Sequence, residues 1–344
     1  MNLFKHSLII IFFLMILPGR LTASEMIDTI YFQNGNQNTG EVKSLLNDML
    51  NLSTDHAGTM KIQWTKVDSV SILSKMRIVL TDGEILYGVL LPSGVVKSCI
   101  IWGSEGEPVL LTLSSIVELS PIEEKFIERL SGTVSSGFSY TKASEVMQLS
   151  LNGTLKYMAE KNLTEISYGG IVTQEPIEGT TQRQKGGISL QRLMPKKWFL
   201  ATQLMAESNS ELQLDLRTTI GIGIGNSIIH TQRTHCFTEG GILGNRELSQ
   251  ENRQNNIEGL LGIDYSVFIH ENPDVSFHVS SNIIPSLSDL GRIRSNTESN
   301  LKWEIFNDFY LKWSFYYSYD SKPLSTGAEK SDWAISMLGL EYKL

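Results

Sequence analysis

The sequence predicts an all-β protein in which a small duplicated β domain precedes a C-terminal antiparallel transmembrane β-barrel of about twelve strands. Two observations support this fold class. Apolar side chains recur at every second position through much of the C-terminal half, and no run long and apolar enough for a membrane helix follows the first 24 residues. We therefore expect any membrane crossing to use a closed barrel, because every strand in lipid needs a paired neighbour.

Residues 1–24 have the pattern of a secretory signal peptide. Lys5 and His6 precede the apolar run 8–17, and the small residues 22–24 follow it at cleavage positions. A membrane anchor is the alternative, but the run is shorter than the roughly twenty residues that a spanning helix needs. An exported chain with amphipathic strands indicates the outer membrane of a Gram-negative cell.

Residues 25–120 predict a periplasmic domain built from two similar halves. Asn34-Gly35 and Asp82-Gly83 each follow an apolar strand, at an offset of about 48 residues. Such dipeptides are strong signals for tight hairpin turns. One copy has too few strands for a core, so we expect the two to form an SH3-like or Sm-like unit with Trp64 and Trp102 packed inside.

The partners of this domain follow from charge and location. Sm-like barrels often bind RNA, but the export signal and the net charge of -8 exclude a nucleic-acid partner. An adaptor role with a periplasmic or peptidoglycan partner is the remaining hypothesis. Cys99 and Cys236 lie far apart, one in each predicted domain, so we expect no disulfide framework.

Residues 121–132 change character and predict a linker helix. Pro121 fits the first turn, Glu123 and Glu124 follow it, and Arg129 comes late, as the helix dipole favours. The helix could lie along the membrane surface or against the barrel mouth.

The barrel is predicted over residues 133–344. Strands are expected to begin near Thr133, Glu145, Asn162, Gly187, Trp198, Leu212, Ser227, Ile257, Val275, Arg294, Phe309 and Trp333. Two polar segments, 178–186 and 238–256, are expected to form long extracellular loops. Tyr342 and Leu344 end the last strand on its apolar face and predict the signal that the barrel assembly machinery reads.

Charged residues that alternate with the apolar face are expected to point into the lumen. A charge on the lipid face would cost about 2 to 4 kcal/mol at the membrane midplane. The predicted lumen-facing residues are Asp215, Arg217, Asp264, Arg294, Glu298, Lys302, Glu304 and Lys312, and Glu258 falls on the same face. Because both signs are present, we expect a network of paired charges that rigidifies the barrel or lines a narrow polar pore.

Catalytic motifs are not evident in the sequence. His230, His235, His270 and His278 are the candidates for an outer-membrane lipid hydrolase, but no Gly-x-Ser-x-Gly motif accompanies them. His230, His235 and Cys236 have no repeated spacing of metal ligands. We expect no catalytic residues, no metal and no cofactor.

Four segments of the barrel half carry a family resemblance: residues 132–144, with Gly-Phe-Ser-Tyr-Thr-Lys-Ala-Ser from Gly137; residues 214–225; residues 284–294; and residues 317–323 with the closing strand. In order and spacing, residues 132–344 resemble the DUF481 family, bacterial proteins described as salt-induced outer membrane proteins. The resemblance implies an outer-membrane barrel of unassigned activity and offers no catalytic residues to carry over.

The predicted function is passive: a narrow channel, or a structural component of the envelope. The alternatives are a lipid hydrolase and an adaptor that acts through the periplasmic domain. The expected surroundings are outer-membrane lipid for the barrel and the periplasm for the N-terminal domain.

Overall fold

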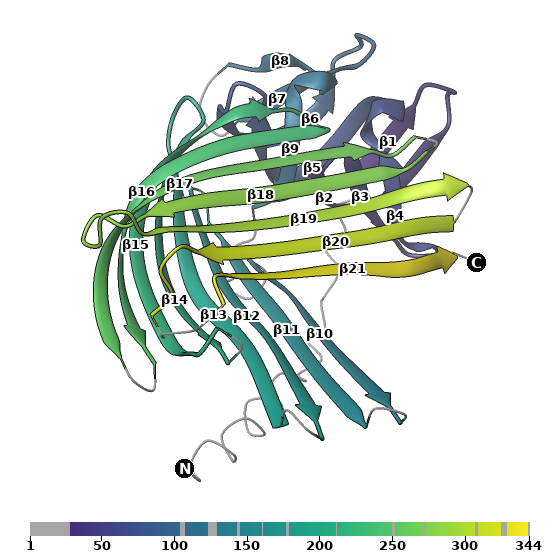
Figure 1. Ribbon diagram of the computed structural model, residues 1–344. Helices are drawn as coiled ribbons and strands as arrows, with labels where there is room; N and C mark the ends of the chain where they lie inside the picture. Colours follow the sequence, from purple (N-terminus) through teal and green to yellow (C-terminus); the bar gives the residue numbers. More distant parts are fainter. Residues whose placement is uncertain are drawn as a thin grey trace.

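The computed structural model describes residues 28–103, 107–122, 129–142, 145–159, 161–176, 179–210, 212–249, 252–271, 273–306, 309–324 and 329–342. The predicted signal peptide lies outside these ranges, as do residues 123–128 of the predicted linker helix. The regular structure of the described residues consists of β-strands and two short 3₁₀ helices. Figure 1 shows a small N-terminal domain packed beside a large curled sheet.

The N-terminal domain is a nine-stranded antiparallel sheet. Its elements are β1 (Asp28–Phe32), β2 (Gln37–Leu46), β3 (Met49–Thr54), β4 (Gly58–Gln63), η1 (Trp64–Lys66), β5 (Val67–Leu80), β6 (Ile85–Pro92), β7 (Ser98–Gly103), β8 (Val109–Thr112), η2 (Leu113–Ser115) and β9 (Ile116–Pro121). The same order occurs twice: a hairpin with Gly at positive φ, two more strands, a 3₁₀ helix and a closing strand. We call β1–β4 with η1 copy one, and β6–β9 with η2 copy two.

Strand β5 belongs to both copies. Its first part pairs with β1 in copy one, where Val70 lies opposite Ile30. Its second part pairs with β6 and β9 in copy two, where Ile78 lies opposite Leu86 and Leu119. The two copies are therefore built around one continuous strand.

One hydrophobic core serves the whole domain. Trp64 of copy one is 2% exposed, and its Nε1 donates to the carbonyl oxygen of Leu113 in copy two at 2.8 Å. The predicted burial of Trp102 is wrong, because this side chain is 57% exposed on β7. Alternation explains the difference: the neighbouring Ile101 points into the core, so Trp102 points out.

The large sheet has twelve antiparallel strands in sequence order. They are β10 (Leu130–Thr141), β11 (Val146–Met158), β12 (Asn162–Glu175), β13 (Gly179–Leu193), β14 (Trp198–Asn209), β15 (Leu214–His230), β16 (Thr234–Leu248), β17 (Arg253–Ile269), β18 (Val275–Pro285), β19 (Ile293–Phe306), β20 (Phe309–Asp320) and β21 (Ser331–Tyr342). The prediction of an all-β chain with about twelve C-terminal strands is confirmed.

The two predicted long loops are wrong. The first, residues 178–186, lies mostly in β13, and the second, residues 238–256, lies mostly in β16 and β17. Their polar residues alternate with outward apolar ones such as Ile242, so they form one face of strands rather than loops. The largest shifts in predicted strand starts are at β13 and β16, beside these segments.

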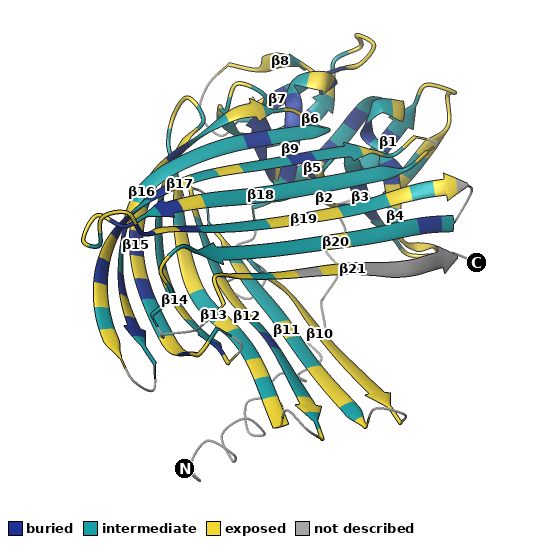
Figure 2. Ribbon diagram, viewed as in Figure 1, coloured by how far each residue is buried: buried dark blue, intermediate teal, exposed yellow. Residues whose placement is uncertain are grey.

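The convex face of the sheet is an exposed apolar belt. On β15, Ile220, Ile222 and Ile224 are exposed, while the glycines between them face the concave side. The belt continues over neighbouring strands through Ile188, Leu190, Leu204, Ile242, Leu261 and Ile263. Figure 2 shows the contrast with the N-terminal domain, where the buried residues concentrate. Within the described ranges, no helix is long and apolar enough to span a membrane.

Strands β10 and β21 are the two edges of this sheet, and no backbone pairing joins them in the described part of the chain. The curl brings other strands together instead. Arg183 on β13 donates to Asp332 Oδ2 on β21 at 3.0 Å, and its guanidinium lies 4.2 Å from the ring centre of Tyr316 on β20. Side chains therefore connect distant strands across the concave face.

Candidate functional site

Seven charged side chains meet on the concave face of the large sheet, and we call them the ion-pair cluster: Glu207, Arg217, Glu247, Glu258, Arg292, Arg294 and Asp320. They come from β14 to β17, from the turn before β19, and from β19 and β20. All lie toward the end of the sheet formed by the turns after β14, β16, β18 and β20, which we call the far end. The opposite end, formed by the turns after β11, β13, β15 and β17, is the near end.

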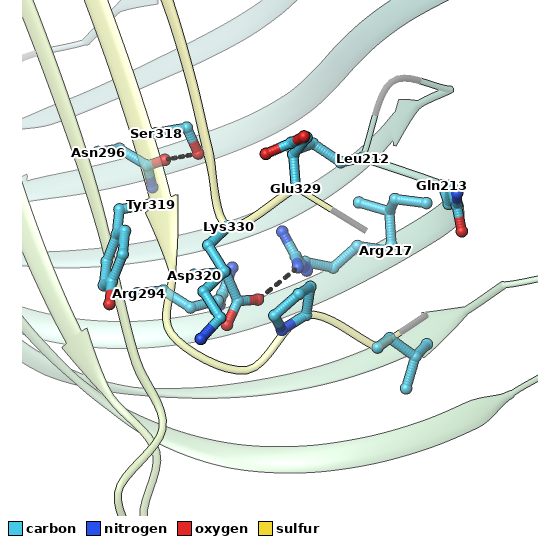
Figure 3. A pocket seen from close by; sticks show the side chains of 13 residues that line it. Leu212, Gln213, Arg217, Arg294, Asn296, Ser318, Tyr319, Asp320, Glu329 and Lys330 are labelled. Carbon is cyan, nitrogen blue, oxygen red and sulfur yellow. Dashed lines mark hydrogen bonds and ion pairs between the residues drawn. The ribbon is translucent and has the colours of Figure 1, made fainter. Parts of the chain in front are cut away.

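Two arginines organise most of the cluster. Arg217 donates from Nε to Glu247 Oε1 at 2.8 Å and also pairs with Glu207. Arg292 donates to Glu247 Oε2 at 2.9 Å and, from Nε, to Asp320 Oδ1 at 3.0 Å. The Arg217 guanidinium also lies 3.8 Å from Asp320 Oδ2, a contact that crosses from β15 to β20 (Figure 3).

The centre of the cluster is deeply buried. The side chains of Glu247 and Glu258 are 0% exposed and that of Arg292 is 1% exposed. Arg294 completes the group by donating from Nε to Glu258 Oε1 at 3.0 Å. Buried charges are tolerated when they are paired and hydrogen-bonded, as these are. The cluster therefore fills the concave side near the far end with fixed polar groups.

The other predicted lumen residues lie apart from the cluster. Asp215 and Glu298 are exposed. Lys302 lies 3.9 Å from the ring centre of Tyr310, and its neighbour on β20 is Lys312. Glu304 Oε2 accepts the backbone N–H of Asp274 at 3.0 Å.

The predicted assembly signal lies at the edge of the described chain. Tyr342 is the last residue of β21 and pairs with Phe309. Leu344 lies outside the described residues.

Asp264 takes part in a grouping that the sequence did not reveal. Ser266 Oγ lies 2.8 Å from His278 Nδ1, and His278 Nε2 lies 3.6 Å from Asp264 Oδ2. Ser266 and His278 are direct cross-strand neighbours on β17 and β18. These are the residue types of an activated nucleophile, and the Ser266–His278 contact is a hydrogen bond, but the 3.6 Å between His278 and Asp264 is longer than one. Only the pairing register, which alternation alone does not fix, brings these residues together.

A second candidate site is the contact between the N-terminal domain and the near end, which we call the docking seam. Asn47 and Asp48 form the turn between β2 and β3, with φ of 53° and 64° as a tight hairpin turn requires. This turn inserts between two turns of the large sheet. Arg233 Nε donates to Asp48 Oδ2 at 2.8 Å, and His270 Nε2 lies 2.7 Å from the Asn47 carbonyl oxygen.

Backbone groups of copy two extend the docking seam. Gln232 donates from Nε2 to the carbonyl oxygens of Leu113 at 2.9 Å and Ile116 at 2.8 Å. These contacts hold the N-terminal domain in position, because the carbonyl acceptors belong to the backbone of η2 and β9 and move only with those elements.

Glu118 on β9 carries the charged part of the seam. It lies 3.5 Å from Arg77 in its own domain and 3.8 Å from His230 of β15. Burial raises the pKa of Glu118, but the hydrogen bond with His230 and the charge of Arg77 outweigh it and hold the pKa below its ordinary value. The carboxylate therefore stays ionised at the seam.

Close backbone contact completes the seam at the turn between β5 and β6. Gly83 has a φ of +85°, and a Cβ at this position would lie 2.9 Å from the backbone nitrogen of Lys197. Gly35 of copy one has a φ of +81° with nothing within 4 Å. The two turns are alike in conformation, but only at Gly83 does the large sheet occupy the space that a Cβ would need.

The histidines of the docking seam lie at the contact between the two domains. His230 and His235 have ring centres 5.3 Å apart, and His235 Nε2 lies 3.2 Å from Asn47 Oδ1. Among the described residues, no group of His, Cys, Asp and Glu is arranged to hold a metal ion. Cys99 and Cys236 are both buried and free.

A twelve-stranded antiparallel sheet with an apolar convex belt and a charged concave face is the architecture of a β-barrel protein. The family model described as "Protein of unknown function, DUF481" matches residues 132–344, which covers β10 to β21 and more than half of the chain. The chain therefore belongs to the DUF481 family, as its sequence predicted. The match does not include the N-terminal domain.

The other comparisons add little. No curated protein matches the sequence. A solved structure of a NanC porin matches with 10% identity and a TM-score of 0.35, covering 62% of this chain and 99% of the porin chain. A likeness with this TM-score carries no argument about function.

Proposed function

We propose that the protein is an outer-membrane β-barrel that holds its N-terminal β domain at the periplasmic end, and so acts as an envelope component rather than as an open pore. The observation that carries the proposal is the docking seam. Hydrogen bonds from Gln232, Arg233 and His270 attach the N-terminal domain to successive turns of the near end. Such a seam makes the domain a fixed part of the barrel mouth.

The apolar belt supports the membrane location. Exposed isoleucines and leucines on adjacent strands would be unfavourable in water, and lipid accommodates them. Fractionation tests this part: the full chain is expected in the outer-membrane fraction, with heat-modifiable mobility on gels. Recovery as a soluble periplasmic protein would overturn the proposal.

The ion-pair cluster favours a structural role over a channel. Its buried carboxylates and arginines bridge β15 to β20 on the concave face, where a pore would need free space. We expect the purified full chain in planar bilayers to show no discrete conductance. Reproducible single-channel steps would favour the narrow channel instead.

A hydrolase is the second candidate, and the Ser266, His278 and Asp264 geometry favours it. The backbone amides beside Ser266 pair with β16 and β18, so an oxyanion would have to be stabilised by side chains. A fluorophosphonate probe should label Ser266 if the serine is activated. Labelling of the wild type that is lost in Ser266→Ala would support the hydrolase, and equal labelling of both would remove it.

A further inference from the structure

The two copies of the N-terminal domain differ on their outer faces, although equivalent strands pair with one another in both. The pairing of β2 with β3 has an irregularity between Val42 and Ser44 that the pairing of β6 with β7 lacks. In copy one, the cross-strand neighbours on this face are Glu41 with Ser53 and Asn51 with Lys61. In copy two, the equivalent neighbours are Val89 with Trp102 and Ile100 with Leu110. Duplication thus provides an internal control: the same fold position is polar in one copy and apolar in the other.

The apolar residues of copy two are not needed for its core. The core side of these strands is occupied by Leu90, Cys99 and Ile101, which are all buried. We call the opposite side the outer apolar face: Val89, Leu91, Val96, Ile100, Trp102 and Leu110. Leu110 is 59% exposed and Val96, at the tip of the turn between β6 and β7, is 71% exposed. Figure 1 places β7 and β8 on the rim of the N-terminal domain.

The outer apolar face continues toward the convex belt of the large sheet. Ile85 shares its side of β6 with Val89 and lines a groove of about 860 Å³ between the turn after β5 and the near end. Leu200, an exposed residue of β14, lines the same groove. The groove therefore joins the apolar face of copy two to the face that we assign to lipid.

Basic side chains line the barrel side of this groove. Lys161, Arg192 and Lys196 come from the turns and strand ends of the near end, and none is ion-paired to a residue of the described part of the chain. Asp82 and Glu84 lie on the opposite side, in the N-terminal domain. Cations beside an apolar wall at the end of a membrane strand complement the phosphates of phospholipid headgroups.

We infer that the outer apolar face of copy two docks on the phospholipid surface of the membrane that holds the barrel, with anionic headgroups in the basic groove. This inference rests on the proposed function, which places the domain at the periplasmic end. A protein interface of useful size would carry about one hydrogen bond per 100–200 Å². Within the outer apolar face only the Trp102 indole N–H can donate a hydrogen bond, with Tyr87 and Thr112 at its margin. A bilayer surface does not require a larger set of polar groups.

The test compares matched positions in the full chain. Leu110→Cys and its copy-one equivalent Lys61→Cys are each labelled with a polarity-sensitive fluorophore, and the protein is reconstituted into vesicles of phosphatidylethanolamine and phosphatidylglycerol. The native cysteines give little background, because both are buried and burial raises the pKa of Cys99 to about 11. Insertion of the barrel is followed separately by heat-modifiable mobility.

The label at position 110 is expected to emit at shorter wavelength and to be quenched by nitroxide lipids, while the label at position 61 is quenched by iodide in water. Adding Val89→Glu and Trp102→Ser introduces the residues that copy one has at the equivalent positions. This change should make position 110 as accessible to iodide as position 61. Equal accessibility of both labels in an inserted barrel would overturn this inference but leave the proposed function standing. Protection at position 110 in native envelopes but not in lipid vesicles would indicate a protein partner and also overturn it. Failure of the barrel to insert would overturn the proposed function as well.

Discussion

At the scale of single residues, Arg292 shows how this chain uses buried charge. It lies in the turn before β19, is 1% exposed, and joins Glu247 of β16 to Asp320 of β20. An arginine suits this position because its planar guanidinium donates to two carboxylates at once. Together with Arg217 it neutralises Glu247, whose side chain is 0% exposed.

Replacing Arg292 with methionine is expected to lower the free energy of unfolding by about 3–5 kcal/mol, because it leaves a buried carboxylate with one partner fewer. Urea unfolding of the detergent-folded full chain measures the change. Lys322→Ala is the control, since this exposed lysine pairs with Asp289 at 2.9 Å and its loss should cost less than about 1 kcal/mol. A similar small change in both variants would show that the cluster contributes little to stability.

Glu118 makes the docking seam sensitive to acid. Its pKa is held below the ordinary value of 4.5, so its stabilisation of the folded state is fully present above pH 4.5 and is lost as the pH falls through the lower folded value. We expect wild type to be more stable than Glu118→Gln at neutral pH. The difference in melting temperature should shrink as the pH falls below 4.5. A difference that stays constant with pH would show that the charge of Glu118 does not matter.

At the scale of elements, the two hairpin turns with a positive-φ glycine allow two effects of an alanine substitution to be distinguished: backbone strain, and a clash with the large sheet at the docking seam. Ala at either Gly35 or Gly83 costs about 1 kcal/mol or more in strain, since both adopt the left-handed region. A Cβ at Gly83 also meets the backbone of Lys197, whereas one at Gly35 meets nothing. Gly83→Ala is therefore expected to be the more destabilising, and only this variant should increase cleavage between the two domains by a protease. Equal effects on both counts would argue against a tight seam at this turn.

Sequence patterns predicted the strands well, but they predicted poorly which side chains of distant strands meet. The alternation of apolar and polar residues located most strands, because one face of each strand lies against apolar surroundings and the other against polar ones. It failed at residues 238–256, where inward polar side chains were interpreted as a loop. Arg217 and Arg294 were among the predicted lumen residues, but Glu247, Arg292 and Asp320 were missed. Their meeting depends on the curl of the sheet, and Arg292 lies in a turn where alternation gives no signal.

At the scale of the whole molecule, the seam decides whether the protein behaves as one body. Gln232 and Arg233 lie side by side in one turn and bind both copies of the N-terminal domain. The double variant Gln232→Ala with Arg233→Ala is expected to release the domain, because it removes these hydrogen bonds without changing the apolar belt. Limited proteolysis between residues 121 and 130 should become faster, while heat-modifiable mobility of the barrel stays unchanged.

Arg253→Ala is the control for this release, since Arg253 is an exposed residue at the far end. It should leave the cleavage rate at its wild-type value. If the double variant resists protease as wild type does, the remaining contacts at Glu118 and His270 are sufficient to hold the domain.

The shared strand β5 has a consequence for folding. Because its two parts complete different copies, neither copy can lose its structure without exposing the hydrogen-bonding groups of the other. The bond from Trp64 to Leu113 and the common core add to this coupling. We therefore expect the duplicated domain to unfold as a single cooperative unit, with one melting transition. Neither of the half-domains that a cut within β5 creates should be stable alone.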